Sequence, residues 1–118
     1  MLIGTSEGEG WRYEVIQRAE DYLVRMRDLD TGVLEESDGK LFRTAAVAFA
    51  YAELSAAFDR YAAARIAGTD VAGLEQELAA HRALYEDVSA RLADEGLSAE
   101  VLAASEQWAA AARRRRLH

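Results

Sequence analysis

Four arginine side chains near the start of this chain have the residue type and spacing to bind anions. Arg12 and Arg18 lie in the segment WRYEVIQR, and Arg25 and Arg27 lie in YLVRMRDL. A guanidinium group is a planar fork that binds phosphates or carboxylates through paired hydrogen bonds. A second basic group follows near the end of the sequence and consists of Arg113, Arg114, Arg115 and Arg116. We interpret both groups as candidate binding residues for a partner protein or for a nucleic acid.

The residues needed for common catalytic centres are missing from the sequence. There is no cysteine, and no glycine-rich phosphate loop precedes a predicted helix. The triplet Asp30-Thr31-Gly32 offers one carboxylate, whereas hydrolysis by paired aspartates needs two that face each other, so we interpret it as a turn. Arg113 and His118 have a spacing similar to that of small helical ribonucleases, but four consecutive arginines produce that spacing almost automatically. We expect a protein without catalytic activity, without a cofactor and without a metal.

His81 is the remaining residue that could take part in chemistry. It lies on an apolar stripe, one helical turn after Glu77. A di-iron site in a helical bundle needs Glu-x-x-His on two helices and two further glutamates, whereas the spacing here is four residues and occurs once. We therefore predict a core or helix-interface histidine, and a pH-sensitive contact is the alternative because histidine titrates near neutrality.

Length and charge limit the possible classes of protein. The chain has 118 residues, the size of one domain, and 51% of them are hydrophobic, which is enough for one core. Its formal net charge of −7 disfavours indiscriminate binding to nucleic acid or anionic lipid. The longest apolar stretch, 44–52, is far shorter than the roughly 20 residues of a membrane span, and no secretion signal is recognisable. We expect a cytoplasmic protein without a membrane partner, and the alanine- and arginine-rich composition indicates a bacterial or phage source.

Apolar and polar residues alternate through the first third of the chain, which is the period of a strand with one solvent-exposed face. The alternation predicts strands at 11–18 and 22–29, a turn at 30–32, a short third strand at 33–35 and a second turn at 37–40. Together they would form an antiparallel β-meander. The side chains expected on its inner face are Trp11, Tyr13, Val15, Tyr22, Val24 and Met26. The opposite face would carry the four arginines.

A helix is the alternative for the same segment. Several of its apolar residues also share one side of a helix, and Glu14–Arg18 and Asp21–Arg25 would be stabilising pairs four residues apart. A helix would leave Tyr13 and Val24 exposed, whereas the strands leave Ile16 and Leu23 exposed. We predict strands because two tight-turn sequences follow closely, and an all-α four-helix bundle is the alternative fold.

From residue 44 onward the apolar residues recur every three or four positions, which is the period of amphipathic helices. The pattern predicts helices at 44–67, 70–94 and 98–116, with Thr44 and Gly68 capping the two ends of the first. The main buried stripe of the first helix would be Val47, Ala50, Leu54, Ala57, Phe58 and Tyr61. Short links make the helices antiparallel neighbours.

The predicted fold class is therefore α+β: an N-terminal β-meander at 11–36 that packs on a long helix, followed by an antiparallel helical hairpin. We expect one domain over 11–118, and we expect the glycine- and glutamate-rich segment 1–10 to be flexible. Helices with this much alanine can also pack closely against a second copy, so a homodimer is compatible with the sequence.

The run from residue 11 to residue 53 resembles, as a pattern, the bacterial and phage units in which a β-meander precedes a helix. These include the N-terminal arm-binding domain of tyrosine integrases, and the resemblance implies a sheet that contacts DNA through its arginines. Acidic residues at positions 14, 20, 21 and 28 interrupt that face. Glu14, Glu20 and Asp28 could form cross-strand pairs with the arginines instead. We therefore predict a small protein-interaction module that acts as an adaptor, an accessory factor or an inhibitor of a partner protein. A nucleic-acid-binding regulator is the alternative.

Overall fold

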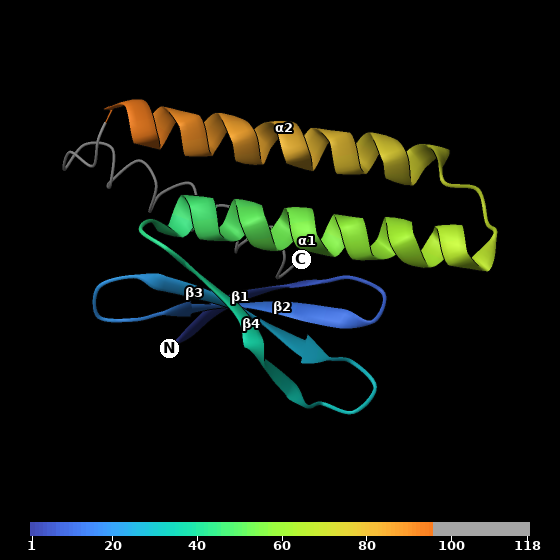
Figure 1. Ribbon diagram of the computed structural model, residues 1–118, viewed down its shortest axis with the longest axis horizontal. Helices are drawn as coiled ribbons and strands as arrows, with labels where there is room; N and C mark the ends of the chain where they lie inside the picture. The colour runs from blue at the N-terminus through green and yellow to red at the C-terminus, as the bar shows by residue number, and fades with distance from the viewer. Residues whose placement is uncertain (96–118) are drawn as a thin grey trace.

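A computed structural model describes residues 1–95, apart from the side chains of residues 36–38 and 92–95. These residues form a four-stranded antiparallel sheet with the simple order β1-β2-β3-β4, followed by two antiparallel helices (Figure 1). The elements are β1 (Leu2–Glu7), β2 (Trp11–Gln17), β3 (Tyr22–Asp28), β4 (Leu34–Phe42), α1 (Ala45–Ala67) and α2 (Ala72–Glu95). Helix α1 lies between the sheet and α2, so the molecule has three layers (Figure 1). The predicted α+β fold is confirmed, and the all-α alternative is not supported.

The two central strands follow the predicted alternation. Val15 pairs with Val24 and Tyr13 pairs with Met26, and these side chains point toward α1. Tyr13, Val15 and Val24 are buried. The core therefore lies between this face of the sheet and α1.

The segment predicted to be flexible, residues 1–10, instead contains a strand. Residues Leu2–Glu7 form β1, which pairs with β2 apart from an irregularity between Leu2 and Gly4. Glycine content indicated flexibility, but Gly4 has a packing role, because a Cβ atom there would lie 2.5 Å from Cε1 of the Phe49 ring. Gly4 thus lets the strand lie close to α1, a contact between distant parts of the chain that local composition does not reveal.

The last strand is longer than predicted. The turn expected at 37–40 is wrong, because β4 is continuous over Leu34–Phe42. Its pairing with β3 is irregular: Val24 pairs with Lys40 and Met26 with Glu35, so that position 25 of β3 faces positions 36–39 of β4. The turn-forming residues are accommodated by this irregularity within the strand, as in a β-bulge.

Helix α1 begins and ends at the predicted residues. The Thr44 side chain accepts a hydrogen bond from the backbone N–H of Val47 at 3.4 Å, and Gly68 ends the helix with φ of 74°, a conformation that favours glycine. The predicted buried stripe is only partly correct, because Phe58 is 54% exposed. The residues of α1 that pack against the sheet are Ala45, Ala48, Phe49, Ala52 and Ala56. Small side chains allow the helix axis to approach the sheet closely, while other residues of α1 contact α2.

Helix α2 starts two residues later than predicted, and the Asp70 carboxylate accepts a hydrogen bond from the Ala72 N–H at 3.1 Å. The helix expected at 98–116 lies outside the described residues, and so do Arg113 to Arg116. Within residues 1–95, no helix combines the length and the apolar character needed to cross a membrane.

Candidate functional site

One face of the sheet is not covered by either helix of the described chain (Figure 1). Side chains alternate along a strand, so this open sheet face carries the residues that lie between the core-facing ones in the sequence. They are Arg12, Glu14 and Ile16 from β2, and Leu23, Arg25 and Arg27 from β3. Three of the four arginines predicted as binding residues therefore lie together on it.

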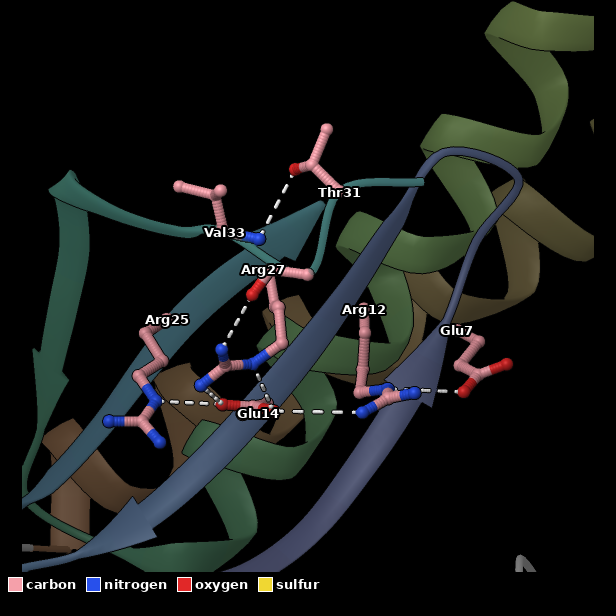
Figure 2. Close-up of polar contacts among 8 residues, drawn as sticks. Glu7, Arg12, Glu14, Arg25, Arg27, Thr31 and Val33 are labelled. Atoms are coloured by element: carbon pink, nitrogen blue, oxygen red, sulfur yellow. Dashed lines mark hydrogen bonds and ion pairs between the residues drawn. The ribbon is translucent and has the colours of Figure 1, made fainter. Parts of the chain in front are cut away.

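Glu14 is the centre of an arginine cluster. Arg25 Nε lies 2.8 Å from Glu14 Oε1, and Arg27 Nε lies 3.0 Å from Oε2, both at hydrogen-bond distance. Arg12 approaches from the same strand, with its NH1 4.0 Å from Oε2 (Figure 2). The register produces this arrangement, because it places Glu14 directly opposite Arg25 and places Arg12 opposite Arg27.

The arginines cover Glu14 even though no helix does. Glu14 is only 3% exposed, whereas the three arginine side chains keep about a third of their surface in contact with solvent. Burial raises the pKa of the Glu14 carboxyl, but the hydrogen bonds and positive charges of Arg27 and Arg25 outweigh it, so that the pKa is lowered below its ordinary value. Glu14 is therefore ionised at neutral pH and orients the guanidinium groups around it.

Two of the arginines also bind neighbouring groups. Arg27 NH1 donates a hydrogen bond to the backbone carbonyl of Gly32 at 2.8 Å, which fixes the β3–β4 connection over the cluster. Arg12 Nε donates to Glu7 Oε1 on β1 at 3.1 Å (Figure 2). The cluster is thus a connected network across three strands. Its three cations and two carboxylates leave it with one excess positive charge.

Arg18 does not belong to this arginine cluster. It follows the end of β2 and pairs with Asp21 at 3.0 Å across the β2–β3 connection. The prediction that the four arginines form one surface therefore holds for three of them. Asp28, which was expected to pair across strands, instead accepts hydrogen bonds from the N–H groups of Asp30 and Thr31.

Next to the arginine cluster, an apolar row crosses all four strands. Leu2 pairs with Ile16, Ile16 with Leu23, and Leu23 with Leu41. Direct partners in an antiparallel sheet point to the same side, so these four side chains share the open sheet face. The end residues of the row, Leu2 and Leu41, are 51% and 56% exposed. Ile16 and Leu23 were recognised from the sequence as exposed apolar residues, but their alignment with Leu2 and Leu41 depends on the register.

The other candidates have structural roles. Asp30-Thr31-Gly32 is a turn, as predicted, with Gly32 at φ of 74°. His81 lies between the helices, with Nδ1 3.6 Å from Glu53 Oε2 and Nε2 3.9 Å from Glu77 Oε1, which confirms a helix-interface position. No group of three or more potential metal ligands occurs among the residues that the structure describes.

Comparison of the chain with protein-family models, with curated proteins and with solved structures finds no match. The arrangement of side chains on the open sheet face is therefore the basis of the functional argument.

Proposed function

We propose that this protein is a non-catalytic interaction module that binds another protein through the open sheet face. The observation that carries the proposal is the apolar row of Leu2, Ile16, Leu23 and Leu41 beside the arginine cluster. Protein interfaces combine an apolar centre with a polar rim, and arginine is enriched in them. Leu2 and Leu41 are exposed and Ile16 and Leu23 are half-buried, so the row leaves apolar surface in water that a partner would cover.

The charges favour a protein surface over a nucleic acid. A nucleic-acid interface needs several cations that neutralise phosphates. Here Arg12, Arg25 and Arg27 are already bound to Glu14 or Glu7, and the whole chain has a net charge of −7. A partner with apolar side chains would pack on the apolar row, and one or two carboxylates at its edge would pair with the arginine cluster. The nucleic-acid regulator predicted as the alternative has less support.

The test starts with proteins that co-purify with the full chain from cells of the source organism. Binding of each purified candidate is then compared between the wild type and Leu41→Asp. We expect at least a tenfold loss of affinity, because a charge would be buried in the apolar centre of the interface. Ile66→Asp is the matched control, since Ile66 is an exposed apolar residue near the end of α1, away from the sheet.

Two outcomes would contradict the proposal. In the first, Leu41→Asp and Ile66→Asp bind the partner as tightly as the wild type does. In the second, a gel shift at low salt shows DNA or RNA binding that falls steeply at moderate salt, which would favour the nucleic-acid alternative.

A further inference from the structure

We infer that a second site, on the opposite side of the sheet, binds a small aromatic carboxylate. This site is a cavity of about 350 Å³ at the place where the sheet, α1 and α2 meet. Its lining residues are Tyr13, Met26, Tyr51, Leu54, Ser55, Phe58, Leu78 and Arg82. The volume lies at the lower end of the range for small-molecule sites, so the ligand is small. This inference does not depend on the proposed function, because none of these residues lies on the open sheet face.

The walls of the cavity are apolar and aromatic. Tyr13 and Met26 are direct partners on β2 and β3, and they form its floor. Tyr51 and Phe58 line the cavity from α1, and Leu78 lines it from α2. Aromatic rings and a methionine thioether make favourable contacts with an aromatic ring of a ligand. The chemistry of the walls therefore favours a flat, apolar ligand body.

Tyr13 supplies an unused hydrogen-bond donor. It is only 8% exposed, and its hydroxyl makes no hydrogen bond to any other residue that the structure describes. Tyr13 lines the cavity, so its hydroxyl can donate a hydrogen bond to a ligand oxygen there. Burial, followed by the nearby Asp59 and Tyr51, raises the pKa of Tyr13 to about 12. The hydroxyl therefore keeps its proton at neutral pH and can donate it in a hydrogen bond.

Arg82 supplies the positive charge that would bind the carboxylate of the ligand. Its side chain lines the cavity from α2, and it makes no ion pair or side-chain hydrogen bond with any side chain that the structure describes. This distinguishes it from Arg12, Arg25 and Arg27, which all bind carboxylates. A free guanidinium beside an apolar cavity is complementary to a carboxylate on an apolar body, because the fork can bind both carboxylate oxygens.

The experiment is isothermal titration calorimetry of the full chain with 3-phenylpropionate, and with 3-phenylpropanol as the neutral analogue of the same shape. We expect saturable binding of the acid and about tenfold weaker binding of the alcohol, which cannot pair with the guanidinium. Arg82→Gln should weaken binding of the acid by about tenfold and leave binding of the alcohol unchanged. Arg91→Gln is the control, because Arg91 is an arginine of the same helix that does not line the cavity and pairs with Asp87.

Tyr13→Phe removes only the hydroxyl, and it should weaken binding of the acid severalfold with little change in the apolar contacts. A circular dichroism spectrum equal to that of the wild type shows that each variant is folded. The inference is overturned if the acid shows no saturable binding, if acid and alcohol bind equally, or if folded Arg82→Gln binds the acid as the wild type does.

Discussion

Asp59 of α1 accepts a hydrogen bond from the backbone N–H of Trp11, at 3.1 Å between Trp11 N and Asp59 Oδ2. The same oxygen accepts the N–H of Gly10 at 3.0 Å. One carboxylate of the helix thus holds the β1–β2 hairpin, although 48 positions separate the two residues in the chain. Gly8 is part of the same contact, because a Cβ atom there would lie 2.2 Å from Asp59 Oδ2.

Asp59→Ala should lower the free energy of unfolding by about 1–3 kcal/mol, because two partly buried amides lose their acceptor. Urea denaturation measures the change. Asp59→Asn is the control, since its side chain keeps one acceptor oxygen and should cost less. Equal stability of Asp59→Ala and the wild type would show that the hairpin does not depend on this carboxylate.

Gly4→Ala should destabilise the protein by about 1–3 kcal/mol, as an overpacked core does. The new Cβ atom would meet the Phe49 ring at 2.5 Å, and this ring is fully buried between the sheet and α1. Gly10→Ala is the matched control, because a Cβ atom at Gly10 meets nothing within 4 Å. Thermal unfolding of both variants measures the difference, and a similar melting temperature for the two would contradict the close approach of β1 to α1.

Glu14→Gln should reduce stability near pH 7 by about 1–3 kcal/mol, because three arginines lose their shared counter-ion. The pKa of Glu14 is lower in the folded protein than its ordinary value of 4.5. The carboxylate therefore stabilises the fold fully above that ordinary value, and its contribution is lost as the pH falls through the lower folded pKa. Urea denaturation at several pH values should show the wild type and the variant converging in acid, whereas a constant gap would argue against an ionised Glu14.

Tyr13 should ionise well above the ordinary tyrosine pKa of 10.0 in an alkaline titration that follows tyrosinate absorbance. Burial above all, and then Asp59 and Tyr51, raises its pKa to about 12. Because the fold favours the neutral phenol, its contribution to stability is present below the unfolded pKa of 10.0 and is lost as the pH rises toward 12. Tyr13→Phe should remove the step near pH 12, and Asp59→Asn should move it to lower pH. A step that persists in Tyr13→Phe would assign the shifted pKa to another residue.

The sequence pattern was sufficient to predict features that depend on a single strand or helix. Alternation placed β2 and β3, and it also showed which of their side chains face the core. Thr44 and Gly68 ended α1 as predicted, because a cap depends on residues within one helical turn. Features that depend on contacts between distant parts of the chain were predicted less well. The stripe of α1 was misjudged because Phe49 and a row of alanines contact the sheet, whereas Phe58 of the predicted stripe is exposed.

By itself, the sequence determined the fold class, the two central strands, the limits of the first helix and the side of the sheet on which the arginines lie. Only the tertiary structure decided that Leu2–Glu7 is a strand, that Glu14 binds arginines from two strands while Arg18 lies apart, and that an apolar row continues across four strands. The physical reason is that periodicity is a property of one segment, whereas register, close approach and charge pairing are set between segments. Tyr13 and Arg82 illustrate this, because they are far apart in the chain and share a cavity only after the layers have packed.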